Sequence, residues 1–350
     1  MRPTRPALAA GGTLILDTRG NVWGFEPYKD DWGTSVEDVK PKQMKGLSRI
    51  AAIQPGIALH EHGSVYVWGP IEDNKRKVIW HSKHPVKLPG IDDATAVASV
   101  GSSFLILRKD GGVWGIGATK SDKIGLRRER GVPIENVLKP RKLKFLEKPI
   151  VRISGASRRA LALSTDGTVY AFLGPNALVR PREVATWYED DYGALQFDAG
   201  NDVCDVVTGV AANFLIRKDG SVWEWGKLYT GSTPDESTGS VPRKYVALPR
   251  KALGFEGVVS LSANASVLAL KGDGTLWARG DNSSGHVGLG PDVKFVASPV
   301  HIPIPKTIAS ISSGETAVGA LDEAGQLWLW GGIVAPGSFE PGAVPEFRAK

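Results

Sequence analysis

The sequence predicts an all-β fold, and three observations lead to this prediction. The 350 residues include 42 Gly and 23 Pro, which both destabilise helices and central strands and therefore indicate many turns between short elements. One glycine recurs every 43 to 56 residues along the whole chain. Each of these glycines has an aliphatic residue four positions before it and an aromatic residue three positions after it.

The repeat has seven copies, and neither flanking position fails in any of them. The glycines are Gly20, Gly63, Gly111, Gly167, Gly220, Gly274 and Gly325. The aliphatic residues are Leu16, Leu59, Leu107, Leu163, Ile216, Leu270 and Leu321. The aromatic residues are Trp23, Tyr66, Trp114, Tyr170, Trp223, Trp277 and Trp328. In four copies an aspartate precedes the glycine, and Asp-Gly between apolar runs predicts a β-hairpin because both residues tolerate positive φ.

About 50 residues per copy suit an antiparallel sheet of about four strands. The residues around each turn alternate with period two, so that one side of each hairpin can be buried against a neighbouring copy. We therefore predict a seven-bladed β-propeller that forms a single domain over residues 1–350. An open β-solenoid is the alternative, but its coils are usually much shorter than this period.

The two ends of the chain are expected to close the propeller. Residues 5–12 are similar to the segments that precede the later hairpins, such as 97–101 and 308–314. After Gly332 only a short tail with Ala343 and Val344 remains. We predict that one terminal segment pairs beside the other in a shared blade.

The aliphatic strand, Asp-Gly turn and Val-Trp-x-x-Gly pattern resembles the repeat of the regulator of chromosome condensation family. The fullest match runs from Asp273 to Gly290 and resembles the family's Trp-Gly-x-Asn-x-x-Gly-Gln-Leu-Gly-x-Gly tail. Elsewhere that tail is eroded, as at Trp114–Gly117 and Tyr170–Gly174. The resemblance implies seven blades. The family includes a guanine-nucleotide exchange factor, ubiquitin-ligase accessory domains and a bacterial inhibitor of β-lactamase, so it does not select a function.

The repeat aromatics are expected to pack between blades, since their distance from the turn is fixed. A second set of aromatics lies two residues further on and is expected on the same face of the strand. This second set includes Phe25, Trp68, Phe172, Trp225 and Trp330.

The sequence contains no assembled metal or catalytic motif. The only local histidine pairs are His60 with His62 and His81 with His84, and neither has an evident third ligand. The single cysteine, Cys204, precludes an intrachain disulfide and is expected to be a buried, inert thiol. No nucleophile elbow and no phosphate-binding loop is present. We therefore predict no cofactor, no metal and no catalytic activity.

Charge is concentrated in two segments between hairpins. Residues 118–152 contain 11 Lys and Arg against 4 acids, while the whole chain has a net charge of +6. Arg127, Arg128 and Arg130 in this segment could meet phosphates or an acidic protein, although a solvated loop is the simpler explanation. Residues 183–205 carry seven acids and no Lys or Arg.

The acidic segment includes a run of aromatic and acidic residues outside the repeat pattern. The run is Trp187, Tyr188, Glu189, Asp190, Asp191 and Tyr192. It is either a protein-binding hot spot, since large rings bury area while the charges attract a basic partner, or an outer blade strand. The sequence does not decide between these.

The leading hypothesis is a non-catalytic, monomeric propeller that binds another protein. Its most specific form is a bacterial inhibitor or immunity protein whose acidic segment blocks a basic enzyme or toxin. The alternatives are a guanine-nucleotide exchange factor for a small GTPase and a nucleic-acid-binding scaffold. No stretch without charged residues exceeds 16 residues, and the amino-terminal apolar run is short, so we expect a cytoplasmic protein without a membrane span.

Overall fold

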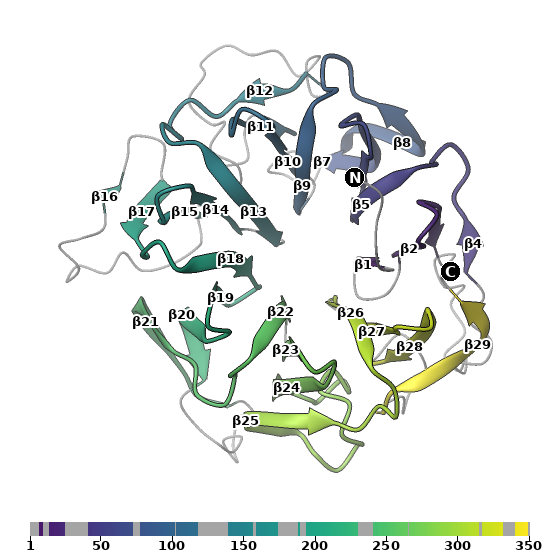
Figure 1. The fold of residues 1–350 in the computed structure, drawn as a ribbon, viewed down its shortest axis with the longest axis vertical. Coiled ribbons are helices and arrows are strands. Elements are labelled where there is room, and N and C mark those ends of the chain that lie inside the picture. Colours follow the sequence, from purple (N-terminus) through teal and green to yellow (C-terminus); the bar gives the residue numbers. More distant parts are fainter. Residues whose placement is uncertain are drawn as a thin grey trace. The chain divides into compact units, whose positions relative to one another are not determined.

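The computed structural model describes most of the chain and shows an all-β protein (Figure 1). The described residues are 7–9, 14–24, 41–72, 78–101, 103–117, 139–156, 159–173, 188–189, 194–229, 241–264, 266–314, 317–331 and 340–348. No helix occurs in these ranges. Their strands form seven sheets, one for each copy of the repeat.

The first four sheets follow the order of the chain, except that the fourth has an additional strand. The first is β1 (Ala7–Ala9), β2 (Leu14–Leu16), β3 (Val22–Gly24) and β4 (Lys42–Gln43). The second is β5 (Ile50–Gln54), β6 (Ile57–His60), β7 (Val65–Glu72) and β8 (Val78–Lys87). The third is β9 (Ala94–Val100), β10 (Ser103–Arg108), β11 (Val113–Ile116) and β12 (Arg141–Lys142). The fourth has the order β13 (Ile150–Ala156), β14 (Arg159–Ser164), β15 (Thr168–Leu173), β17 (Ala194–Asp198) and β16 (Tyr188–Glu189).

The last three sheets each have four consecutive strands. The fifth is β18 (Val203–Thr208), β19 (Ala212–Arg217), β20 (Val222–Tyr229) and β21 (Arg243–Lys251). The sixth is β22 (Val258–Ala263), β23 (Ser266–Lys271), β24 (Leu276–Asp281) and β25 (Phe295–Ile302). The seventh is β26 (Ile308–Ser313), β27 (Val318–Asp322), β28 (Gln326–Trp330) and β29 (Gly342–Arg348).

Each repeat glycine lies in the hairpin turn between the second and third strands of its sheet. In the third repeat, the Gly111 N–H donates to the Arg108 carbonyl at 3.0 Å, and the Arg108 N–H donates to the Gly112 carbonyl at 2.9 Å. Gly111 has a φ of +77°, but among the described non-glycine residues only Arg49 has a positive φ. Asp110 instead accepts the Gly112 N–H through Oδ1 at 2.8 Å. The predicted hairpins are confirmed, but the aspartate acts through its side chain and not through positive φ.

The turn glycine also connects its blade to the next part of the chain. Its carbonyl accepts a hydrogen bond of 2.9–3.0 Å from the segment that leads into the following sheet. A Cβ on Gly167 would lie 2.4 Å from the Gly200 carbonyl oxygen, so the two backbones are too close for a side chain. The donor and acceptor pairs are Ile50 to Gly20, Ala94 to Gly63, Ile150 to Gly111, Ala199 to Gly167, Val258 to Gly220 and Ile308 to Gly274.

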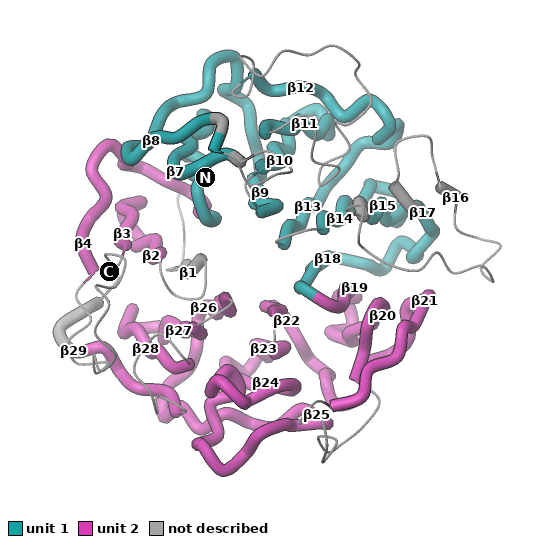
Figure 2. The backbone as a smooth tube through the Cα atoms, turned by 180° about the vertical axis from the view of Figure 1, so that it is seen from behind, with its two compact units in different colours: residues 1, 54–210 teal, residues 2–53, 211–350 magenta. Residues whose placement is uncertain are grey.

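The structure divides into two compact units (Figure 2), residues 1 and 54–210 in unit 1 and residues 2–53 and 211–350 in unit 2. In unit 1, one buried apolar cluster joins the third and fourth sheets and includes Leu143 and Tyr170. In unit 2, a second cluster joins the sixth and seventh sheets and includes Leu276 and Trp330. The predicted packing of neighbouring blades is therefore present within each unit. A single domain over residues 1–350 stays a prediction.

In the described ranges the first and last strands lie in different sheets, so the prediction that the terminal segments pair in a shared blade is wrong. β1 pairs with β2, with Ala7 opposite Leu16, and β29 pairs with β28, with Ala343 opposite Trp328. Each terminal sheet therefore takes all its strands from consecutive chain. Within unit 2 the backbone of β1 lies against β26, so the first and last sheets are neighbours.

Candidate functional site

In five blades, a proline on or just before the outer strand is followed two positions later by a polar or basic residue. Proline is tolerated on an outer strand because it lacks only an N–H that no further strand would use, and it protects the edge from pairing with other chains. Two residues after the proline, the side chain lies directly opposite the repeat aromatic on the neighbouring strand. The prolines are Pro41, Pro85, Pro140, Pro249 and Pro299. The opposed pairs are Gln43–Trp23, Lys87–Tyr66, Lys142–Trp114, Lys251–Trp223 and His301–Trp277.

The repeat aromatics differ in burial. Tyr170 is 3% exposed and belongs to the core of unit 1, as expected. The other six are only half-buried. The second-position aromatics Trp225 and Trp330 are fully buried, whereas Trp68 is half-buried. The side chains of Phe25 and Phe172 lie outside what the structure describes.

In three blades a cation from the strand before the turn lies over the half-buried indole. Such a cation–π contact stabilises by about 0.5–1 kcal/mol at exposed sites. The distances to the ring centroid are 5.2 Å from the Arg108 guanidinium carbon to Trp114, 4.7 Å from that of Arg217 to Trp223, and 4.1 Å from Lys271 Nζ to Trp277.

The indole of each of these blades thus lies between one cation over its ring and a second basic residue on the outer strand. We call these three groups the turn clusters and define each by its residues. They are the third-blade cluster (Arg108, Trp114, Lys142), the fifth-blade cluster (Arg217, Trp223, Lys251) and the sixth-blade cluster (Lys271, Trp277, His301).

The first and seventh blades have a carboxylate at the position of this cation. The Trp23 indole N–H donates to Asp17 Oδ2 at 3.1 Å, and the Trp328 indole N–H donates to Asp322 Oδ2 at 3.4 Å. The repeat aromatic therefore lies beside either a cation or a carboxylate. The residue three positions before the repeat glycine decides which.

Residues 139–148 of unit 1 form a basic strip beside the third-blade cluster. Lys139, Lys142 and Lys144 are exposed and have no ion pair with any residue in the described ranges. Glu147 is the one acid in this strip. Unpaired, exposed cations beside an accessible indole suit an acidic protein surface.

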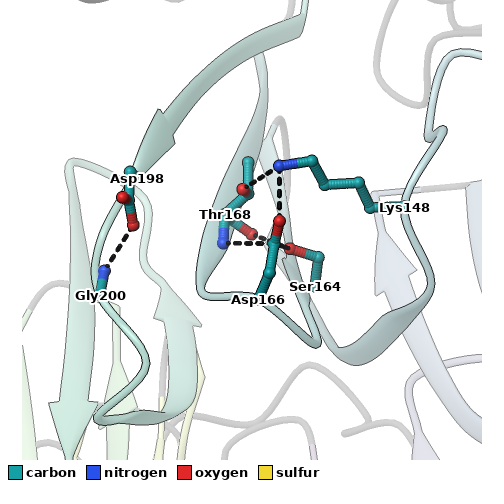
Figure 3. A network of polar contacts seen from close by, with 6 residues as sticks. All are labelled: Lys148, Ser164, Asp166, Thr168, Asp198 and Gly200. Carbon is teal, nitrogen blue, oxygen red and sulfur yellow. Dashed lines mark hydrogen bonds and ion pairs between the residues drawn. The ribbon is translucent and has the colours of Figure 1, made fainter.

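The basic strip ends in a polar network at the turn of the fourth blade (Figure 3). Lys148 Nζ lies 2.6 Å from Asp166 Oδ2 and donates to Thr168 Oγ1 at 2.8 Å. Asp166 Oδ1 accepts from Ser164 Oγ at 2.5 Å and from the Thr168 N–H at 3.2 Å. The hydrogen bonds from Lys148 and Ser164 hold the pKa of the Asp166 carboxyl well below its ordinary value. This lysine is therefore occupied, unlike the three before it.

The inner strands of unit 1 bring together an ion pair and the thiol. β13 lies between β9 and β18, and Arg152 Nε is 4.0 Å from Asp205 Oδ1. Burial raises the pKa of the Asp205 carboxyl, while Arg152 acts in the opposite direction. Cys204 is exposed, so the prediction of a buried thiol is wrong. In β18, Cys204 lies between the buried Val203 and the half-buried Asp205.

Most of the predicted contact residues lie outside the described ranges. This holds for Arg127, Arg128, Arg130, Trp187, Asp190, Asp191 and Tyr192. The backbone of Tyr188 and Glu189 forms β16, a fifth strand whose residues lie opposite Gln196 and Leu195 of β17. The backbone of these two residues is thus part of an outer strand, and both the inward packing of the aromatics and a role of the segment in binding stay predictions.

The histidines do not form a metal centre in the described part of the chain. The rings of His60 and His62 lie 5.3 Å apart, but no group of three or more His, Cys, Asp or Glu there could hold a metal ion. In the same ranges there is no helix with the length and apolarity required to cross a membrane.

Comparisons with known proteins agree with the repeat pattern. No family model matches the chain. The human "E3 ubiquitin-protein ligase HERC2" is 25% identical over 77% of this chain and 6% of that protein, and human "Protein RCC2" is 35% identical over 33% and 22%. The mouse "Regulator of chromosome condensation" is 21% identical over 92% of this chain and 70% of that protein. The chain thus spans only a small part of HERC2 and RCC2.

Solved structures show the same fold. A chain in the crystal structure of Kap60 bound to yeast RCC1 (Prp20) has a TM-score of 0.66 at 18% identity, over 95% of this chain and 85% of that one. Human WBSCR16 has a TM-score of 0.57 at 18% identity, over 93% and 78%. With seven sheets, one per repeat, the chain is a seven-bladed β-propeller of repeats like those of the regulator of chromosome condensation.

Proposed function

We propose that this chain is a non-catalytic propeller that binds an acidic surface of another protein through the turn edges of its blades. The observation that carries the proposal is the basic strip, in which Lys139, Lys142 and Lys144 are exposed beside the half-buried Trp114 and form no ion pair with a described residue. Trp is enriched in protein-binding hot spots, and exposed lysines attract an acidic partner and select it against basic ones.

The use of polar residues in the repeats supports a role in binding and not in catalysis. Asp110 is engaged by the Gly112 backbone N–H, and Asp166 by Lys148, Ser164 and Thr168. These carboxylates close turns and join blades. A general base, by contrast, needs a carboxylate that can reach the proton of a substrate.

A small GTPase is the partner class that we place first. The family resemblance includes an exchange factor, and the mouse regulator of chromosome condensation matches 92% of this chain. The inhibitor hypothesis depends on the acidic segment 187–192, most of which lies outside the described residues. Contacts from that segment and from Arg127, Arg128 and Arg130 belong to the proposal as further predictions.

The exchange activity is tested by the release of a fluorescent guanine nucleotide from a panel of small GTPases. We expect the full chain to accelerate release from one of them. Unchanged release from every GTPase of the panel would contradict the GTPase assignment and leave protein binding to be tested separately.

Protein binding is tested by quantitative affinity capture with the wild-type chain and two double variants. The double variant Lys142→Glu with Lys144→Glu reverses the charge of two residues of the basic strip. Lys227→Glu with Lys244→Glu makes the same charge change at exposed positions of β20 and β21, far along these strands from the turn at Gly220. We expect the first variant to lose the captured partner and the second to retain it. Equal retention by both would contradict the proposed surface.

A further inference from the structure

The sixth blade has a small pocket at its turn edge, in unit 2. Its volume is about 270 Å³, and its apolar lining comes from Leu276, Ile302, Ile304 and Ile308. These four side chains are at most 9% exposed and belong to the core cluster between the sixth and seventh blades. Buried core side chains therefore form the floor of the pocket.

The rim of the pocket is polar and carries one cation and one carboxylate. It includes His301 and Lys306, which are both exposed, and one acid, Asp273. Asp273 Oδ1 accepts hydrogen bonds from the Thr275 N–H at 2.9 Å and from Thr275 Oγ1 at 2.6 Å. These bonds hold the pKa of the Asp273 carboxyl below its ordinary value, and Oδ2 stays on the rim as an acceptor.

A strongly exposed leucine follows the outer strand of the fifth blade, close to the sixth blade. Leu253 is 75% exposed, the highest value among the large apolar side chains that are described as exposed. Its neighbour Gly254 approaches the outer strand of the sixth blade, since a Cβ there would lie 3.0 Å from Pro299 Cδ. Leu253 also follows Lys251 of the fifth-blade cluster by two residues. The pocket, Leu253 and both turn clusters thus lie along one edge of unit 2.

We propose that this edge binds a short acidic protein segment that inserts one aliphatic or aromatic side chain into the sixth-blade pocket. The inference rests on the proposed protein-binding function and identifies the chemistry of the partner. A volume of about 270 Å³ is below the range of roughly 300–1,000 Å³ typical of small-molecule sites and suits one anchoring side chain. Lys306 and Lys271 would pair with carboxylates on either side of the anchor, and Asp273 Oδ2 would accept a backbone N–H of the segment.

The same geometry disfavours nucleic acid as the occupant. Single strands bind where aromatic faces are free to stack on bases. Here Lys271 Nζ already lies 4.1 Å from the centroid of Trp277, and the His301 ring packs edge-on against the same indole at 5.8 Å. The indole is therefore engaged by its own chain and offers no free face on which a base could stack.

The inference is tested by selecting peptides from a displayed random library on the immobilised full chain. We expect enriched peptides to contain acidic residues around one Leu, Ile, Met or Phe. Fluorescence polarisation should then show that replacing this anchor by Ser, or introducing Lys306→Glu into the protein, weakens binding about tenfold, which corresponds to about 1.4 kcal/mol. The variant Lys227→Glu should bind as the wild type does, since Lys227 is exposed but lies at the other end of β20.

Other outcomes would overturn the inference. These are selection of basic peptides or of none, binding that does not depend on the anchor, equal loss in Lys306→Glu and Lys227→Glu, or tighter binding of an oligonucleotide of thymidines than of the peptide. The proposed function is judged separately by affinity capture with the Lys306→Glu chain. If the Lys306→Glu chain still captures the partner and one of these outcomes is observed, the proposed protein binding remains supported and only the role of the pocket is contradicted.

Discussion

At the scale of single residues, the repeat glycines meet two separate requirements. Their φ values are positive, which L-amino acids with a Cβ adopt at a cost of about 1–2 kcal/mol. The turn glycines are also in close contact with the chain that enters the next blade, whereas Gly90, with a φ of +74°, has no atom within 4 Å of the place of a Cβ. Position in the fold therefore decides how much a methyl group costs.

Substitution of Gly111 by Ala should separate these two requirements. Gly90→Ala adds only backbone strain and should lower the free energy of unfolding by about 1–2 kcal/mol. Gly111→Ala adds strain and also places Cβ 2.8 Å from Pro149 Cβ, so that overpacking should cost about 1–3 kcal/mol more. Urea denaturation of both variants measures the difference. Equal losses would show that the close approach has no energetic consequence.

The pH dependence of stability should show the contribution of Asp166. Its pKa is lowered in the folded chain, so the ionised carboxylate stabilises the fold above the unfolded pKa of about 3.9. This stability is lost as the pH falls through and below that value. Because Lys148 and Asp166 are half exposed, solvent limits the effect to about 1 kcal/mol or less.

The check is to compare the wild type with Asp166→Asn by urea denaturation near pH 6 and near pH 3. Near pH 6 the wild type should have a larger free energy of unfolding than Asp166→Asn. This difference between the two proteins should shrink near pH 3. Lys148→Met should reduce the same difference by removing the cation. A stability difference between wild type and Asp166→Asn that is the same at both pH values would contradict the role given to this carboxylate.

At the scale of strands and sheets, a buried carboxylate joins β20 of the fifth blade to β24 of the sixth. The Glu224 side chain is 4% exposed, contacts Arg279 through Oε2 and lies 3.3 Å from Arg250 through Oε1. Arg279 also lies over Phe255 at 5.1 Å. A charge buried this deeply is tolerated only while its partners remain.

A double-mutant cycle on this joint should be strongly non-additive. Arg279→Met leaves Glu224 with the half-exposed Arg250 alone and should cost about 3–5 kcal/mol of unfolding free energy. Glu224→Gln in the Arg279→Met background should recover part of this loss, because no uncompensated charge is then buried. Calorimetry on the four proteins provides the coupling energy. Simple addition of the two single losses would contradict a buried ion pair at this joint.

The hairpins were predictable from sequence, and the outer strands were not. The spacing of Leu107, Gly111 and Trp114 is local, so it recurs wherever the hairpin recurs. The outer strand β12 follows a long connection after Ile116, and its signal is only Pro140 and a basic residue two positions later. The turn clusters join these two parts of the third, fifth and sixth repeats. They were missed because the sequence does not show which lysine lies opposite which aromatic.

At the scale of the whole chain, one repeat is used with different charges. The residue three positions before the repeat glycine is a carboxylate in two blades and a cation in three, while the hairpin itself is constant. The carboxylates are Asp17 and Asp322, and the cations are Arg108, Arg217 and Lys271. Fold could therefore be predicted from the constant positions. The candidate binding surface depends on the variable ones, and much of the predicted surface, including Trp187 and Arg127, lies outside the described residues.

Deletion of residues 1–12 should test whether the first sheet is needed for the chain to be stable. This removes β1, which pairs with β2 and lies against β26 of the last repeat. We expect a sharp fall in the melting temperature measured by circular dichroism, because both β2 and β26 lose a neighbour. An unchanged melting temperature would contradict a stabilising contact between the first and last sheets.

The account as a whole depends on the turn edges being the protein-binding surface. Hydrogen–deuterium exchange of the full chain, alone and with its captured partner, tests this most directly. We predict that the partner slows exchange in a turn-edge range of one unit, either 139–148 of unit 1 or 251–257 with 301–307 of unit 2, and leaves β20 and β21 near Lys227 and Lys244 unchanged. Slower exchange that spares all three turn-edge ranges would contradict the account.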